Sequence, residues 1–418
     1  MSYPMQSEKL YTLSTGDPVY RYEKTIVIFF KGQRKVLSTS IFNGGYHEDY
    51  TAVYNHDGKV GAGMPCEMLA PTYTEHMQIL SRRLGLDPNR VTGMGTAADM
   101  ENAVIETLSY KNLTVTAIVT GGIETNGGRV GDPADYFKPL EKPNRPGTIN
   151  IMLVLDTDLP PGTLARALVT CTEAKTAAIQ ELMEGSKYST GLATGSGTDT
   201  TIVVANSESS LYLEGAGKHS KLGELIGRVV KAAVKKALDK QSGLNPQNQH
   251  NVLRRLQRFH VSTATLWKRY LASFAKGESF SSESDTQRNI TAKMAEKEKQ
   301  GENREPSFSA SSGSRTPLLK PEFLERVEKL AKEDVMVTYT TLYIHLLDQY
   351  LWELLSEDET REAGEMLLLQ LRSKYGVKAD KKGFQGQLVT VETMMEAWEE
   401  LFLACLEQCD ECASVYLL

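Results

Sequence analysis

The 418-residue sequence lacks several features that would assign it to a specialised class of protein. Its five cysteines are a sparse, odd-numbered set that does not resemble a disulfide framework, which favours a reducing compartment. The start, M-S-Y-P-M-Q-S-E-K-L, has neither the basic nor the apolar region of a signal peptide. The apolar run from Thr25 to Phe30 is too short to span a bilayer. We therefore expect a cytoplasmic protein without a membrane span.

Common signatures of metal and cofactor chemistry are also missing. The histidines show no His-Glu-x-x-His spacing, so they predict no metal site, and nothing in the sequence requires a cofactor. Cys405, Cys409 and Cys412 have the spacing Cys-x3-Cys-x2-Cys, which some iron–sulfur enzymes use ahead of a large barrel. Only six residues follow here, so we interpret these cysteines as structural, with metal ligation shared with a partner as the alternative.

Charge is unevenly distributed along a chain of otherwise ordinary globular composition, which is 40% hydrophobic and 24% charged. Residues 321–418 carry 9 Lys/Arg and 20 Asp/Glu, a net of -11, so the total of -6 leaves +5 for residues 1–320. Residues 243–276 hold six basic and no acidic side chains. A short basic run in an acidic chain argues against nucleic-acid binding. It indicates instead that the two segments attract each other or bind a protein partner.

Alternating strand and helix patterns predict an α/β (α+β) layered domain over residues 1–241, in which helices flank a mixed β-sheet. The β-rich runs 25–30 and 36–42 flank the turn-prone K-G-Q-R-K and predict a hairpin. Further strands are expected at 113–119, 149–155 and 201–205, and helices at 66–84, 97–109, 163–184 and 220–239.

The remainder of the chain divides into three segments. Residues 242–276 have apolar positions near helical spacing with arginine and lysine between them, which predicts a basic amphipathic helix. Residues 277–320 are Ser-rich and poor in large aliphatics, as is typical of a disordered linker. Residues 321–418 predict an acidic helical module with a glycine-broken loop at 381–386.

A lysine occupies an unusual position in the helix expected at 163–184. Lys175 lies at the centre of an apolar stripe that also contains Cys171. A lysine among core positions must extend its ammonium to solvent, form an ion pair, or titrate at a shifted pKa. The functional alternative is a cation that faces a carbonyl or carboxylate at the edge of a site. Cys171 is more typical of a buried core residue than of a nucleophile.

A histidine precedes the helix expected from about residue 220. The apolar face of that helix, extended backwards, passes through His219, so we expect the imidazole to point towards the core at the helix N-terminus. The helix dipole there keeps the ring neutral, which suits a general base. A capping or packing histidine is the alternative. Asp199 is the natural carboxylate partner for this base, and Lys218 beside it is either solvated or contacts substrate.

Three glycine-opened polar loops follow or precede expected strands. The loop of Thr194, Gly195, Ser196, Gly197 and Thr198 offers backbone N–H groups that can cradle a carboxylate, phosphate or oxyanion. It is not a nucleotide P-loop, because the terminal Gly-Lys-Ser/Thr is missing. The other two loops are Asn43, Gly44, Gly45 and Asn126, Gly127, Gly128. Turn chemistry explains each loop alone, but their recurrence at strand ends predicts a site lined by loops.

These residues resemble the adenosylcobinamide amidohydrolase family over roughly residues 20–240. The matching stretches include N-G-G at 43–45, L-D-P-N-R-V-T-G-M-G-T-A-A-D-M-E-N at 86–102 and A-I-V-T-G-G-I-E-T-N at 117–126. They continue with P-G-T-I-N-I-M-L-V-L-D at 146–156, A-L-V-T-C-T-E-A-K-T-A-A-I-Q-E-L at 167–182, A-T-G-S-G-T-D at 193–199 and G-A-G-K-H-S-K-L-G-E-L-I-G at 215–227.

The resemblance implies hydrolysis of the amide that joins aminopropanol to the corrin ring of adenosylcobinamide, with the corrinoid as substrate. The resemblance supplies no catalytic assignment, so the roles are inferred from the residues themselves: His219 is the expected base, Asp199 orients it, and the backbone of residues 195–198 stabilises the oxyanion. Lys175 or Asn126 would position the carbonyl. Thr198 or Cys171 as covalent nucleophile, a metal-activated water, and a corrinoid-binding protein without turnover remain alternatives.

Overall fold

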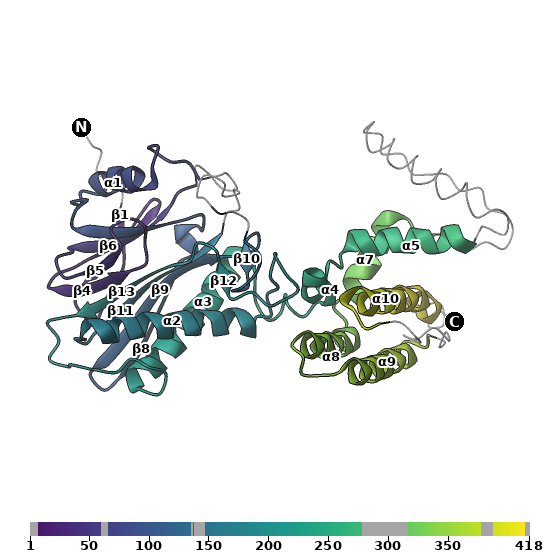
Figure 1. Cartoon of the computed structure of the whole chain (residues 1–418). Helices are drawn as coiled ribbons and strands as arrows, with labels where there is room; N and C mark the ends of the chain where they lie inside the picture. The colour runs from purple at the N-terminus through teal and green to yellow at the C-terminus, as the bar shows by residue number, and fades with distance from the viewer. Residues whose placement is uncertain are drawn as a thin grey trace. The chain divides into compact units, whose positions relative to one another are not determined.

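The structure, a computed structural model, describes residues 7–59, 66–134, 137, 147–277, 317–377 and 388–413. The chain forms two compact units, Met1–Gln249 and His250–Leu418 (Figure 1). The linker expected at 277–320 falls mostly on residues 278–316, which lie outside the described residues, as does the loop expected at 381–386. The two units are therefore considered separately.

Within the described residues, the first unit contains two large sheets and a small one. The five-stranded sheet has the order β1(Ser7–Thr12), β2(Pro18–Tyr22), β3(Thr25–Phe29), β6(Ala52–Asp57), β7(Val91–Thr96). The six-stranded sheet has the order β5(Gly45–His47), β4(Arg34–Ser38), β13(Thr200–Asn206), β11(Thr148–Leu155), β9(Leu113–Gly122), β8(Val104–Tyr110). The short strands β10(Gly127–Gly128) and β12(Gly195–Ser196) form a separate pair. Both large sheets are mixed, because β6 and β7 are parallel, as are β11 and β13, while the other pairs are antiparallel.

Hydrophobic side chains arrange the first unit in four layers, which Figure 1 shows as helix, sheet, sheet and helices. In β11, Ile151 and Leu153 pack on the helices α2(Pro161–Glu181) and α3(Lys221–Ser242), whereas Met152 and Val154 pack towards the five-stranded sheet. This alternation follows from the period of two in a strand that is covered on both faces. Helix α1(Tyr73–Arg83) covers the outer face of the five-stranded sheet. The predicted α/β layered class is confirmed.

Two local predictions are wrong. The runs at 25–30 and 36–42 do not form a hairpin, because β3 pairs with β2 and β6 whereas β4 pairs with β13 and β5. The chain crosses from one sheet to the other here. Next to this crossing Arg34 Nε forms a buried ion pair with Asp17 Oδ2 at 2.8 Å. The helix expected at 97–109 is instead a 3-10 turn, η1(Met100–Asn102), followed by strand β8.

The helices expected at 163–184 and 220–239 are confirmed as α2 and α3. Pro161 opens α2 in the first turn, where its missing N–H is not needed. The Ser220 hydroxyl caps α3 by accepting a hydrogen bond from the Gly223 N–H at 3.0 Å. Gly243 ends α3 in the left-handed region, at φ 67°. These signals place Lys175 within a regular helix and His219 before the start of one.

In its described residues, the second unit is helical and its buried hydrophobic side chains form one core. Its elements are α4(Val252–Leu256), η3(Gln257–Phe259), α5(Thr263–Gly277), α7(Lys320–Leu330), α8(Asp334–Leu351), α9(Glu357–Lys374) and α10(Val391–Ala413). The continuous basic helix predicted at 242–276 is wrong, because His260 adopts φ 65° and interrupts it between η3 and α5.

The basic and acidic segments of the second unit pack together. Leu256 and Tyr270 share a core with Phe323 and Trp398. The buried Arg258 forms a bidentate ion pair with Asp348, with both N–O distances 2.7 Å. The expected attraction between the basic run and the acidic module therefore occurs inside this unit. None of the helices in the described ranges has the length and apolar character to cross a membrane.

Candidate functional site

Two of the three predicted loops meet at one edge of the six-stranded sheet. Residues Thr148 and Gly122 are paired at that edge, and Asn150 pairs with Thr200, the first residue of β13. The segments that precede β11, follow β9 and precede β13 therefore converge. Within them, Gly127 pairs with Ser196 and Gly128 with Gly195, so the loop at 126–128 is joined to the loop at 194–199. Figure 1 shows this pair, β10 and β12, beside the ends of the sheet strands.

The Lys175–Asp199 ion pair lies beneath the joined loops. Lys175 projects from α2 and its ammonium donates to Asp199 Oδ2, and both side chains are about nine-tenths buried, with 11% and 10% exposure. The Ser196 N–H donates to the same oxygen at 3.0 Å. Asp199 Oδ1 accepts from the Ile149 N–H at 2.8 Å and from Ser196 Oγ at 2.7 Å. Four donors thus fix one carboxylate, and the predicted lysine in an apolar stripe is an ion-paired lysine.

Gly195 is required by the close approach of the loop to this pair. A Cβ at Gly195 would lie 2.4 Å from Asp199 Oδ2 and 2.7 Å from Lys175 Nζ. The exposed Gly197 differs, because a Cβ there would meet no atom within 4 Å. The loop therefore rests tightly on the ion pair at Gly195 and opens to free space at Gly197.

The carbonyl of Gly147 joins the remaining parts of the site. The buried Asn126 donates to it from Nδ2 at 2.6 Å, and Thr198 donates to it from Oγ1 at 2.9 Å. Gly147 has φ 140°, and a Cβ there would lie 2.3 Å from Asn126 Oδ1. Asn126 and Thr198 therefore hold three segments together, and their observed contacts are within the protein.

The predicted backbone cradle is in large part occupied by the protein itself. The Thr194 N–H donates to the Gly128 carbonyl at 2.8 Å, and the Thr198 N–H donates to Ser196 Oγ at 3.2 Å. The Ser196 N–H already has Asp199 as its acceptor. These three groups are not available to an oxyanion in this arrangement, which corrects the expectation that residues 194–198 present their N–H groups outwards.

A buried chain of polar side chains supports the same edge and was not predicted from the sequence. Asn150 donates from Nδ2 to Asn55 Oδ1 at 2.8 Å and to the Gly95 carbonyl at 3.0 Å. Asn55 in turn donates to Thr120 Oγ1 at 2.8 Å. Strand β7, through Gly95, is thereby tied to the ends of β9 and β11. The available sequence signal was asparagine inside otherwise apolar strands, because a buried amide needs partners.

The third loop, Asn43, Gly44 and Gly45, has a structural role in its turn. Asn43 lies at φ 50° and donates from Nδ2 to the carbonyls of Pro88 and Val91, at 2.7 and 2.8 Å. Gly44 is required because a Cβ would lie 2.1 Å from the Ser40 carbonyl oxygen. The side chain predicted to bind substrate is therefore committed to the fold.

His219 and Lys218 lie outside this cluster, which corrects the predicted catalytic pair. His219 is exposed in the turn before α3 and is not among the four donors that hold the Asp199 carboxylate. Ser220 has extended backbone angles, φ -83° and ψ 156°, so the helical face cannot be extended back through it. Lys218 is exposed and forms an ion pair with Glu173 at 3.1 Å.

Thiol and metal chemistry find little support in the described residues. Cys171 is fully buried, and burial raises the pKa of its thiol to about 12, so a reactive thiolate is disfavoured. Cys405 is buried, while the side chains of Cys409 and Cys412 lie outside the described part of the chain. Within the ranges that the structure describes, no three His, Cys, Asp or Glu side chains gather in a metal-binding arrangement.

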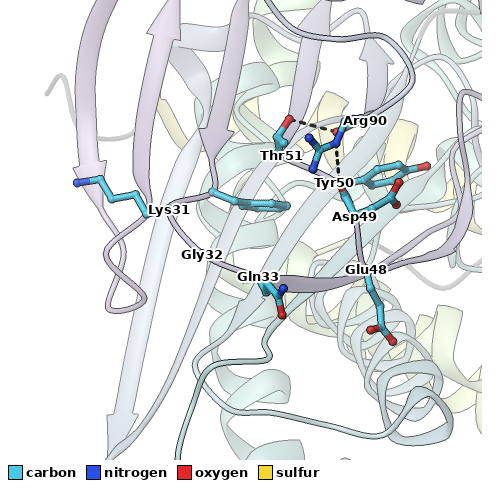
Figure 2. Close-up of a pocket in the computed structure, with 9 residues that line it drawn as sticks. Lys31, Gly32, Gln33, Glu48, Asp49, Tyr50, Thr51 and Arg90 are labelled. Carbon is cyan, nitrogen blue, oxygen red and sulfur yellow. Dashed lines mark hydrogen bonds between the residues drawn. The ribbon is translucent and has the colours of Figure 1, made fainter.

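Two pockets lie apart from the Lys175–Asp199 pair. Figure 2 shows one of about 350 Å³, lined by polar residues that include Lys31, Glu48, Asp49 and Arg90, in which Arg90 Nε donates to the Asp49 carbonyl at 3.0 Å. The second, about 440 Å³, lies along α2 and is lined by Leu168, Val169, Thr172, Glu173, Thr176, Ala177, Gln180 and Lys218. Thr176 connects this second pocket to the loop, because its hydroxyl donates to the Thr194 carbonyl at 3.2 Å.

The fold and the joined loops define a layered α/β protein whose candidate site contains a buried lysine–aspartate pair, a serine and an asparagine. The sequence matches the adenosylcobinamide amidohydrolase family over residues 10–246, more than half of the chain, and the protein belongs to this family. The predicted resemblance is thus confirmed.

Two individual proteins extend the comparison. An uncharacterized protein of Methanocaldococcus jannaschii is 34% identical over 238 residues, which cover 54% of this chain and 89% of that protein. A crystal structure of a Pyrococcus horikoshii OT3 protein covers 55% of this chain and 80% of its own, with 13% identity and a TM-score of 0.24. The latter values are too low to support an inference about function or fold.

Proposed function

We propose that the first unit hydrolyses the amide bond between aminopropanol and the corrin ring of adenosylcobinamide, releasing adenosylcobyric acid. The observation that carries the proposal is the family match over residues 10–246, which includes every segment of the joined loops. An amidohydrolase needs a polar site that holds the scissile carbonyl and supplies protons. The loops at 126–128 and 194–199, with the Lys175–Asp199 pair beneath them, are the best candidate within the described residues.

We assign distinct tasks to the members of this cluster. Asp199 accepts hydrogen bonds from four donors and thereby organises the loop. Lys175 supplies the positive charge that balances the carboxylate. Asn126 and Thr198 fix the neighbouring segments through the Gly147 carbonyl. The loop opens to free space at Gly197, and we place the substrate amide against this part. Pre-organised polar groups of this kind act by stabilising charge that develops in the transition state.

The test is incubation of the complete protein with adenosylcobinamide, followed by mass-spectrometric detection of both products. Release of aminopropanol and adenosylcobyric acid in equal amounts is the expected result. If spectroscopy or calorimetry detects binding of the corrinoid but neither product forms, the protein binds corrinoids without turnover. If the protein neither binds the corrinoid nor releases a product, both functions are contradicted.

A further inference from the structure

A nucleophile for this reaction emerges from the hydrogen bonds around Asp199. Three candidates are compared: Cys171 and Thr198, which the sequence suggested as nucleophiles, and Ser196, whose hydroxyl contacts the carboxylate. Cys171 is fully buried and its pKa is raised by that burial. Thr198 Oγ1 donates to the Gly147 carbonyl, which cannot take up a proton during the reaction. Ser196 Oγ alone among the three donates to a carboxylate, Asp199 Oδ1, at 2.7 Å.

We propose that Ser196 is the covalent nucleophile of the amidohydrolase, with Asp199 as its proton acceptor and Lys175 as a positioning residue. The inference rests on the proposed function. Nucleophile and base lie within hydrogen-bond reach, and a third group orients the base, which is the arrangement that activated hydroxyls require. Lys175 and the Ile149 N–H hold the carboxylate so that Oδ1 faces the serine hydroxyl.

Ser196 is also accessible to a substrate. Its side chain is only partly buried, and the next residue, Gly197, is exposed with no atom within 4 Å of an added Cβ. The Asp199 and Lys175 side chains behind it are nearly enclosed. A reactive hydroxyl at the opening, backed by an enclosed base, allows the amide to approach from outside while water reaches the carboxylate poorly.

The chemical steps balance as follows. Ser196 Oγ forms a bond with the amide carbon while its proton passes to Asp199. The carbon–nitrogen bond then breaks, and the proton on Asp199 moves to the departing nitrogen, which leaves as aminopropanol. Water attacks the resulting ester, giving one proton to Asp199, which returns it to Ser196 Oγ as the bond to the serine breaks. Adenosylcobyric acid is released and the enzyme is restored.

The variant Ser196→Ala tests the assignment, with Ser109→Ala as a matched control. Ser109 is exposed on β8, where its hydroxyl pairs with Thr114 Oγ1 at 2.9 Å, near the start of β9 and so at the opposite end of that strand from the loops. Ser196→Ala should lower aminopropanol release at least about a thousandfold, since loss of a nucleophile removes the covalent route. It should still bind adenosylcobinamide with an unchanged Kd. Ser109→Ala should match the unaltered protein.

A trapping experiment separates a lost nucleophile from a damaged loop. The unaltered protein is mixed with excess adenosylcobinamide, quenched in acid, and its intact mass is measured, with hydroxylamine added in a parallel reaction. Two results support the proposal. One is a mass increase equal to adenosylcobyric acid minus one water, located on the peptide that contains Ser196, and the other is a hydroxamate product. Turnover that yields neither adduct nor hydroxamate overturns it and leaves the proposed function intact, as does near-normal turnover by Ser196→Ala. Absence of any aminopropanol from the unaltered protein overturns the proposed function and this inference with it.

Discussion

Replacement of Gly195 by alanine tests whether the loop and the ion pair form one rigid unit. The new Cβ would lie 2.4 Å from Asp199 Oδ2 and 2.7 Å from Lys175 Nζ, whereas comfortable contacts are about 3.5–4.0 Å. A displacement of roughly 1 Å is therefore needed. Asp199 cannot turn aside easily, because four donors hold it.

The structure allows the size of the effect to be estimated. Forcing an extra carbon into a packed site costs about 1–3 kcal/mol of stability. A shift of about 1 Å among groups that position a substrate lowers the rate by about a hundredfold. We expect Gly195→Ala to show both losses.

Gly197→Ala is the matched control in the same loop. An added Cβ at Gly197 meets no protein atom within 4 Å, so the stability of this variant should stay within about 0.5 kcal/mol of that of the unaltered protein. Urea unfolding followed by circular dichroism measures stability, and aminopropanol release measures activity. If Gly195→Ala proves as stable as Gly197→Ala, the loop does not depend on close contact with the ion pair.

Three further predictions concern buried polar groups. Burial, with His76 nearby, lowers the pKa of His56 to about 4, so the unfolded chain binds a proton more readily than the folded protein does. The free energy of unfolding should therefore fall by up to about 3 kcal/mol between pH 6.5 and pH 4. Urea unfolding at several pH values should show that His56→Gln loses much of this dependence. Asn150→Ala strips the donor from Asn55 Oδ1 and should cost at least about 2 kcal/mol in the same assay; an unchanged midpoint would contradict the polar chain. Asp17→Ala leaves the buried Arg34 without its carboxylate and should cost about 3–5 kcal/mol, a loss that normal thermal unfolding would disprove.

Long periodic segments were predicted correctly from the sequence because their burial pattern is local. The pattern of apolar residues holds over the whole element in helices α2 and α3 and in strands β9, β11 and β13. The sheet to which a strand belongs is not local information. Strands β3 and β4 are adjacent in sequence, yet each belongs to a different sheet, so a hairpin and a crossing between sheets look alike in the sequence.

The site was predicted only in part, because local sequence signals indicate where polar groups gather but not which residues contact one another. Glycine-opened loops at strand ends indicated where polar groups gather, and a lysine in an apolar stripe indicated that it needs a partner. The identity of that partner depends on chain segments 24 residues apart in sequence, Lys175 and Asp199, which no periodicity relates. His219 was misplaced because the helical face was extended through Ser220, where the backbone is already extended. Ser196 was predicted only for its backbone, whereas in the structure its hydroxyl donates to Asp199, three residues later.

The most direct test of the central claim is the rate of aminopropanol release from adenosylcobinamide by three proteins measured side by side. These are the unaltered chain, Lys175→Met, and Lys236→Met as a control that removes an exposed lysine paired with Glu106 at 2.6 Å. We predict steady release by the unaltered chain and by Lys236→Met, and a loss of at least about a hundredfold for Lys175→Met. No release by the unaltered chain, or full activity of Lys175→Met, would contradict an amidohydrolase site built on the Lys175–Asp199 pair.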